Sequence, residues 1–152
     1  MSANAIGGRR TASAPARRRN ARVHRSAKTG AFETTGFMTH FIDPKGNVDF
    51  DVVVDALRLT KGQLADTVGL AAATISKADR RGGPRAQNRV REMLEILERV
   101  HDWAGSDTQA LAWYRAEPIP ALDGRTAEAL VKSGEAAAVR DYLDHLALGG
   151  FA

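Results

Sequence analysis

Hydrophobic residues recur every three or four positions from Val48 onward, which is the spacing of an amphipathic α-helix, and no clear strand pattern interrupts them. Glycine, proline and capping residues divide the pattern into short helices. The positions that we expect to face the core are Phe50, Val53, Val54, Leu57, Leu64, Ala65, Val68, Ile75, Ala78, Val90, Met93, Leu94, Leu97, Val100, Trp103, Val139, Tyr142, Leu143 and Leu146. The pattern predicts an all-α fold.

Local signals between residues 59 and 81 predict a helix-turn-helix. Thr60 and Gln63, three residues apart, form a capping box at the start of one helix. Gly69 follows as the turn residue, because glycine adopts a positive φ at low cost. A second short helix is expected from about residue 71 to residue 79, with Ile75 in the core. In this motif the second helix lies in the major groove of DNA.

That second helix carries few side chains that can distinguish bases. The predicted DNA-contacting residues are Ala72, Ala73, Thr74, Ser76, Lys77, Arg80, Arg81 and Arg85, with the arginines near phosphates. Alanine cannot form bidentate hydrogen bonds to a base and contacts only thymine methyl groups. Position 71 is also alanine, where such motifs usually place a capping serine. We expect weak DNA binding or binding that needs a dimer; the alternative is a motif retained only for packing or dimerisation.

The second half of the chain is predicted to contain four further helices. Pro84 suits the first turn of the longest one. Arg91 and Glu95 on its polar face have the i,i+4 spacing of an ion pair. Ser106, with Gln109 three residues later, forms a second capping box, and Thr126 caps the third of these helices. Gly149 and Gly150 end the last one.

The C-terminal part of the chain has several residue types at characteristic spacings. They are Trp113 within Ala110-Leu-Ala-Trp-Tyr114, the turn prolines Pro118 and Pro120, the run Leu122-Asp-Gly-Arg-Thr126, Gly134 with Val139, and Gly150-Phe-Ala152. Together with the helix-turn-helix, they resemble the Xre-type antitoxins of RES–Xre toxin–antitoxin pairs, whose C-terminal module is called the Xre/MbcA/ParS toxin-binding domain. The resemblance covers residues 49 to 152. Ala127-Glu-Ala-Leu130 replaces the usual Pro-x-x-Leu, which weakens only the start of that helix.

The resemblance implies an antitoxin that neutralises a RES-domain toxin, an enzyme that consumes NAD, by covering its active site. It also implies repression of the antitoxin's own operon through the helix-turn-helix, with operator DNA as a second partner. The chain would be a homodimer within a larger toxin–antitoxin complex.

The residues expected to contact the toxin are Trp113, Arg140, Gly149, Gly150, Phe151 and Ala152. Each of three side chains also has a simpler interpretation. Trp113 is favoured as a core anchor of the helical module, Arg140 as a solvated side chain, and Phe151 equally as a ring that folds back onto the last helix. An aromatic residue beside flexible glycines is a suitable anchor for a partner's pocket.

The net charge of +4 is unevenly distributed. Residues 1–30 hold eight Lys and Arg and no acid, residues 49–105 hold nine of each sign, and residues 106–152 hold four basic and seven acidic residues. The predicted organisation is a disordered basic arm at 1–35, solvated or attracted to phosphates, and a segment at 36–48 that docks or forms a short extended arm. A helix-turn-helix domain with its long following helix would cover 49–104, and the toxin-binding helical domain 105–152.

The sequence contains no recognisable catalytic or metal-binding set. It has no cysteine, and its histidines lack metal spacing: His24, His40, His101 and His145. No apolar run approaches the roughly 20 residues needed to cross a membrane. We expect a cytoplasmic, non-enzymatic protein with no cofactor and no metal. Two alternatives remain: a stand-alone helix-turn-helix transcriptional regulator whose C-terminal domain only dimerises, and a binding module with no DNA role.

Overall fold

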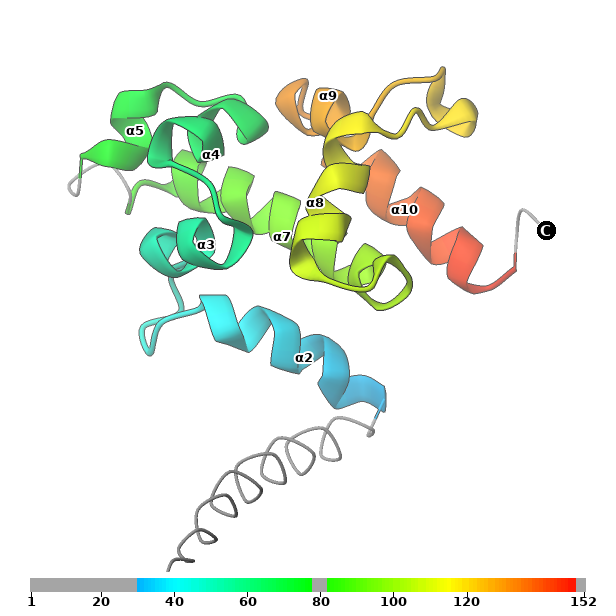
Figure 1. The fold of residues 1–152 in the computed structure, drawn as a ribbon, viewed down its shortest axis with the longest axis horizontal. Coiled ribbons are helices and arrows are strands. Elements are labelled where there is room, and N and C mark those ends of the chain that lie inside the picture. The colour runs from blue at the N-terminus through cyan, green and yellow to red at the C-terminus, as the bar shows by residue number, and fades with distance from the viewer. Residues whose placement is uncertain (1–29, 78–81, 150–152) are drawn as a thin grey trace, which may run out of the picture. The chain divides into compact units, whose positions relative to one another are not determined.

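The computed structural model describes residues 30–77 and 82–149, with side chains from residue 36 onward. The regular elements in these ranges are helical, which confirms the predicted all-α fold, and the described residues from Phe37 onward belong to one compact unit. In chain order the elements are α2 (Gly30–Phe41), α3 (Phe50–Leu57), α4 (Lys61–Val68), α5 (Ala72–Ser76), α7 (Pro84–Ala104), α8 (Asp107–Ala116), the 3-10 turn η2 (Pro120–Leu122), α9 (Ala127–Lys132) and α10 (Ala136–Ala147) (Figure 1). No helix in the described ranges is long and apolar enough to span a membrane.

Helix α7 is the centre of the core because neighbours cover it on more than one side. Helices α4, α8, α9 and α10 all pack against it (Figure 1). Its buried residues are Ala86, Gln87, Val90, Met93, Leu94, Ile96, Leu97 and Val100. Ile96 lies outside the predicted hydrophobic stripe, yet it is fully buried. A helix on the protein surface buries one hydrophobic stripe. Because several helices pack around α7, residues outside that stripe are buried as well.

The helix-turn-helix geometry follows the local signals of the sequence. The predicted capping box is confirmed: Thr60 Oγ1 accepts from the Gln63 amide at 3.0 Å, and Gln63 Oε1 accepts from the Thr60 amide at 2.9 Å. Gly69 ends α4 with φ 74°, as predicted. Helix α5 is shorter than expected: it ends at Ser76, and Lys77 already has an extended backbone. Ala78 lies outside the described residues.

Residues 30–41 form a helix, so of the two alternatives for residues 36–48 the docking segment agrees with the structure and the extended arm does not. Helix α2 includes residues 30–35, so the prediction of a disordered arm is wrong for these residues. Residues 1–29 lie outside the described ranges. Phe41 at its end is 1% exposed, because the Phe37 ring contacts it and the Asp49 amide donates to its carbonyl at 2.8 Å. The turn that follows is attached to α7 by the buried side chain of Gln87, whose Oε1 accepts a hydrogen bond from the Val48 N–H at 2.7 Å.

Two residues that we placed in the core are exposed. Trp103 is 58% exposed and Leu146 is 38% exposed. Each lies in the last turn of its helix, α7 and α10 respectively. The spacing of hydrophobic residues predicts which face of a helix is apolar. It does not predict how far along the helix a neighbouring helix covers that face.

The predicted ion pair between Arg91 and Glu95 is also wrong. Arg91 Nη2 instead donates to the Gly46 carbonyl at 2.9 Å, and Glu95 forms an ion pair with Arg140 at 3.2 Å. Both side chains have tertiary partners from distant segments. Such partners replace the weak pairing that an isolated helix would offer.

Candidate functional site

The C-terminal helices are joined by a closed, well-bonded loop. Ser106 Oγ accepts from the Gln109 amide at 3.1 Å at the start of α8. Beyond α8, Ile119 and Arg125 form an antiparallel bridge around η2. Thr126 Oγ1 then accepts from the Ala129 amide at 3.1 Å and caps α9, as predicted. The missing proline at the start of α9 is therefore compensated by an intact cap.

A bidentate ion pair fixes the same loop onto the start of α10. The two guanidinium nitrogens of Arg125 lie 2.8 and 3.1 Å from the two oxygens of Glu135. Ser133 Oγ donates to Glu135 at 2.7 Å. These hydrogen bonds from Arg125 and Ser133 lower the pKa of Glu135 to about 2. The α8–α9 loop and the start of α10 are thus held in one arrangement.

Two ion pairs connect α7 with α10 and define how the helices are aligned. Glu95 pairs with Arg140 at 3.2 Å, and Arg99 pairs with Asp144 at 2.8 Å. The step from the first pair to the second is four residues on both helices, so α7 and α10 run parallel. The Arg140 side chain is 26% exposed, so it is not the solvated side chain that the sequence favoured.

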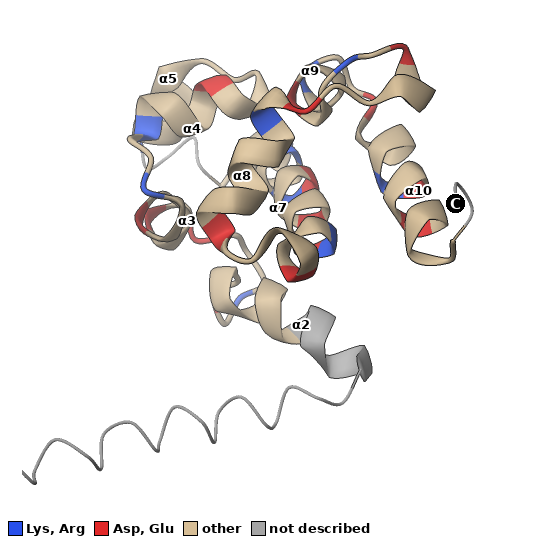
Figure 2. Ribbon diagram, turned by 45° about the vertical axis from the view of Figure 1, so that its right-hand side comes forward, with Lys and Arg blue, Asp and Glu red and all other residues tan. Residues whose placement is uncertain are grey.

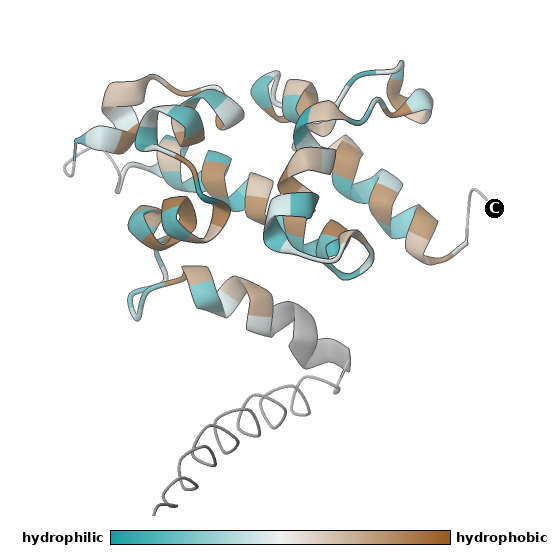
Figure 3. Ribbon diagram, viewed as in Figure 1, coloured by the Kyte–Doolittle hydropathy of each residue, from teal (hydrophilic) through white to brown (hydrophobic). Residues whose placement is uncertain are grey.

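Exposed apolar side chains gather at the C-terminal ends of these two helices. Trp103 stands edge-on to Trp113 of α8, with ring centroids 5.7 Å apart and planes at 90°. Trp113 is partly buried against the core, which fits the anchoring interpretation of that residue. At the end of α10, Leu146 and Leu148 are exposed, the latter by 85%. Figure 3 shows that hydrophobic positions continue to the last turn of α10.

Comparison with known families identifies this part of the chain. The model of the antitoxin Xre/MbcA/ParS C-terminal toxin-binding domain matches residues 97–149. Residues 97–149, about a third of the chain, are thus similar to the toxin-binding domain of this antitoxin family. The match starts within α7, upstream of residue 105 where we expected the module to begin, and it includes both tryptophans. No curated protein and no solved structure matches the chain.

The match supports the resemblance to Xre-type antitoxins and an antitoxin role in a toxin–antitoxin system. Residues 1–96 lie outside the matched region. Of the predicted toxin contacts, Trp113, Arg140 and Gly149 lie inside it, and Gly149 is exposed with φ 79°. Gly150, Phe151 and Ala152 lie outside the described residues, so the structure gives no geometry for the tail.

The predicted DNA-contacting residues differ in exposure. Ala72, Ser76, Lys77 and Arg85 are exposed, whereas Ala73 and Thr74 are half-buried. Arg80 and Arg81 lie outside the described residues. In the described part of the helix-turn-helix, the exposed groups that can contact DNA are thus mostly small or cationic.

The turn of the helix-turn-helix is attached to the toxin-binding domain and its neighbours through buried contacts. Tyr114 Oη donates to the Thr67 carbonyl at 2.9 Å, and Arg89 Nη1 donates to the Val68 carbonyl at 2.9 Å. A Cβ on Gly69 would lie 3.3 Å from the Lys132 Cα. We did not foresee these contacts, because each joins residues more than twenty positions apart. The signal that the sequence offered was Tyr114 itself, because a tyrosine hydroxyl that becomes buried usually has a hydrogen-bond partner.

Glu98 is a poorly solvated carboxylate on α7. Its Oε2 atom is buried without a hydrogen-bond partner. Burial raises the pKa of Glu98 to about 7, and the negative charges of Glu95 and Asp102 act in the same direction against the opposing effect of Arg99. No sequence pattern indicated this, since a glutamate on a long amphipathic helix is usually solvated.

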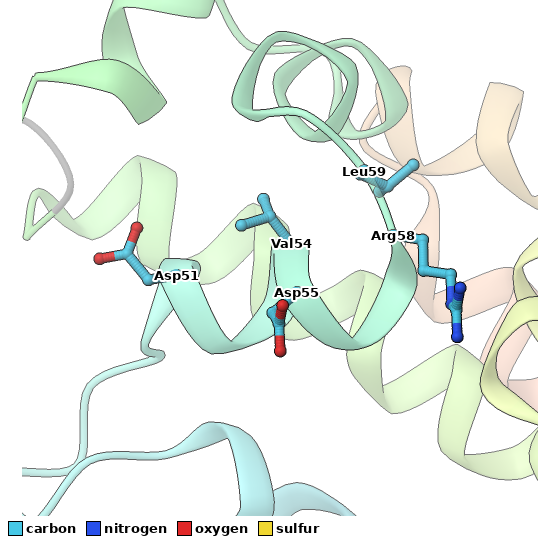
Figure 4. A pocket seen from close by; sticks show the side chains of 5 residues that line it. All are labelled: Asp51, Val54, Asp55, Arg58 and Leu59. Atoms are coloured by element: carbon cyan, nitrogen blue, oxygen red, sulfur yellow. The ribbon is translucent and has the colours of Figure 1, made fainter.

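Helix α3 carries an open hollow on its outer surface. It is lined by Asp51, Val54, Asp55, Arg58 and Leu59 (Figure 4). Asp51 is engaged by Lys61 at 3.5 Å. The hollow lies outside the region that matches the toxin-binding domain, and its shallow, charged lining does not enclose a ligand.

Proposed function

We propose that the toxin recognised by this chain is a RES-domain enzyme that consumes NAD. Two features support the proposal: the resemblance of residues 49–152 to the antitoxins of RES–Xre pairs, and the toxin-binding domain at residues 97–149. The single observation that carries it is the match to that domain. NAD chemistry would belong to the toxin, and the antitoxin would act only by binding.

Inhibition would be steric. Leu148 directly follows α10 and is exposed just before Gly149, so apolar side chains lead into the C-terminal residues. In this proposal α10 and Gly149–Ala152 cover the entrance of the toxin's active site, and the Phe151 ring occupies an apolar pocket there. Arg140 would hold α10 against α7 through Glu95 rather than contact the toxin.

The helix-turn-helix would serve autorepression. Helix α4, the Gly69 turn and helix α5 have the order of a helix-turn-helix, which supports this role, and Lys77 and Arg85 are exposed and would contact phosphates. Its small side chains give little base discrimination, so a homodimer that contacts two half-sites would supply the missing affinity.

Co-expression tests the antitoxin assignment. Cells that make the RES-domain protein encoded in the same operon should stop growing, and production of this chain should restore growth. A chain lacking Gly149–Ala152 should neutralise less well while keeping the helical circular dichroism and melting temperature of the full chain. The matched control is a chain lacking residues 1–29, which should still neutralise.

Each outcome separates the parts of the proposal. Failure of the full chain to restore growth excludes the RES partner. Full neutralisation by the C-terminally shortened chain rules out the tail as the inhibitory element. For autorepression, the full chain should shift its own promoter DNA in a gel, and the absence of a shift at moderate salt contradicts that role.

A further inference from the structure

The alignment of α7 and α10 predicts which side chains lie beyond their two ion pairs. One further step of four residues leads from Arg99 to Trp103 on α7 and from Asp144 to Leu148, the residue directly after α10. Side chains four residues apart lie on the same face of a helix. By this alignment, the exposed Trp103 and Leu148 occupy the next positions after the two ion pairs, at the C-terminal ends of the two helices.

We define the Trp–Leu surface as Trp103, Trp113, Leu146 and Leu148. All four residues lie within the matched region 97–149. Among the described residues, Trp103, Leu146 and Leu148 are the exposed large hydrophobic side chains. Isolated exposed apolar residues are ordinary, but a tryptophan and two leucines at the adjoining ends of two helices are typical of a binding surface.

Exposed acidic residues lie close in sequence to the residues of the Trp–Leu surface. Asp102 precedes Trp103 and its side chain is 84% exposed, whereas Asp144 lies one turn before Leu148 and is 56% exposed. Asp141 is also exposed on α10. Figure 2 shows acidic residues on both α7 and α10. The nearest arginine in the series, Arg99, is engaged by Asp144.

We propose that the Trp–Leu surface binds an apolar pocket on the toxin whose rim carries cationic side chains. The inference rests on the proposed function. An enzyme that binds NAD needs an apolar pocket for a flat ring system, and it needs cationic or N–H donors for the diphosphate. An indole beside exposed carboxylates presents the same two features, so the antitoxin would occupy the dinucleotide site in part by resembling its ligand.

A second copy of this chain is a less suitable occupant. Pairing two Trp–Leu surfaces would bring the exposed Asp102 of both copies close together, and like charges across an interface oppose association. A cationic rim on a different protein removes that cost and adds attraction. This charge complementarity selects the toxin over a homodimer partner.

Affinity measurements with the full chain and the RES-domain protein of the same operon test the proposal. Trp103→Ala should weaken binding by about tenfold to a hundredfold, because buried tryptophans dominate interface energies. Trp103→Phe should stay within about threefold, because it keeps an aromatic ring. Asp102→Asn should weaken binding several-fold and flatten its salt dependence. The matched control is Asp55→Asn, an exposed acid on α3 outside the matched region, which should leave the affinity unchanged.

Two spectroscopic measurements on the same complex sharpen the test. The chain contains two tryptophans, so labelling with 5-fluorotryptophan gives two ¹⁹F resonances, which Trp103→Phe assigns. The Trp103 resonance should shift on binding. A non-hydrolysable NAD analogue at saturating concentration should reverse that shift by competition.

The proposal and the function it rests on fail in different ways. If the unmodified chain does not bind the RES-domain protein, the proposed function is wrong. If the unmodified chain binds but Trp103→Ala binds equally well with an unchanged melting temperature, the Trp–Leu surface is not the contact. If Trp103→Ala converts a dimer to a monomer and keeps its affinity for the toxin, the surface is a homodimer interface and the proposal is overturned.

Discussion

The hydroxyl of Tyr114 donates a 2.9 Å hydrogen bond to the backbone carbonyl of Thr67, which lies 47 positions earlier in the chain. Thr67 is in the last turn of α4, where helix carbonyls have no partner within the helix. Arg89 satisfies the next carbonyl, that of Val68, in the same way. Residues from α7 and α8 thereby complete the C-terminus of the first helix of the helix-turn-helix.

Replacing Tyr114 with phenylalanine should therefore destabilise the whole unit. Burial raises the pKa of Tyr114, so its hydroxyl stays protonated and remains a donor across the accessible pH range. Tyr114→Phe leaves the buried Thr67 carbonyl without a donor, which costs about 1–2 kcal/mol. Urea denaturation followed by circular dichroism measures this loss. An unchanged urea midpoint would show that the bond contributes nothing to stability.

Alanine at Gly69 should cost more than alanine at Gly124. The two glycines have nearly the same φ, 74° and 73°, so the left-handed conformation penalises both substitutions by about 1–2 kcal/mol. At Gly69 the added Cβ would also lie 3.1 Å from Lys132 Cγ and 3.3 Å from Arg89 Nη1, whereas Gly124 has open space. We expect Gly69→Ala to exceed Gly124→Ala by about 1 kcal/mol in the free energy of unfolding. Equal losses in the free energy of unfolding for Gly69→Ala and Gly124→Ala would contradict a close contact between Gly69 and Lys132.

Glu98 predicts a pH-dependent effect on stability. Its pKa is raised from 4.5 to about 7 in the folded chain, so the folded state holds the proton more tightly than the unfolded state. Stability is full below the unfolded value, falls as pH rises between the two values, and is lowest above the folded value. Glu98→Gln removes the charge. It should stabilise the chain by about 1 kcal/mol at pH 8, after allowance for partial solvent exposure, and by little at pH 4.

Thermal unfolding at the two pH values checks the Glu98 prediction. Glu117→Gln is the control, because Glu117 is exposed just after α8 and has no comparable burial. A stabilisation by Glu98→Gln that is the same at pH 4 and pH 8 would refute the account of its burial.

The local features of this fold were predictable from sequence, and the tertiary ones were not. The capping box at Thr60, the Gly69 turn and the Thr126 cap depend on neighbouring residues, and all three are as predicted. Trp103 continues the hydrophobic stripe of α7, but its exposure depends on where the covering helices end.

Most of the candidate site was missed because it also depends on tertiary contacts between distant segments. The partners of Glu95 and Tyr114 come from segments about 45 positions away. The spacing of residues within one helix contains no information about those segments. The C-terminal residue types identified the domain, whereas the ion pairs that position α10 became visible only in the folded chain.

Lys77 and Arg85 provide a test of the DNA interface. Lys77 directly follows α5 and Arg85 lies in the first turn of α7; both are exposed, and we proposed phosphate contacts for them. Lys77→Ala and Arg85→Ala should each weaken binding to promoter and unrelated DNA alike and reduce the salt slope of the binding constant by about one. Arg115→Ala, an exposed arginine on α8, serves as the control. A loss confined to the promoter sequence would mean that these residues read bases rather than phosphates.

We proposed that residues 97–149 and the tail that follows cover the active site of a RES-domain toxin. The most direct measurement is the rate at which that purified toxin consumes NAD in the presence of increasing amounts of the full chain. We predict stoichiometric inhibition that is weakened when Gly149–Ala152 are removed. A rate of NAD consumption that does not change with an excess of the full chain would contradict the claim.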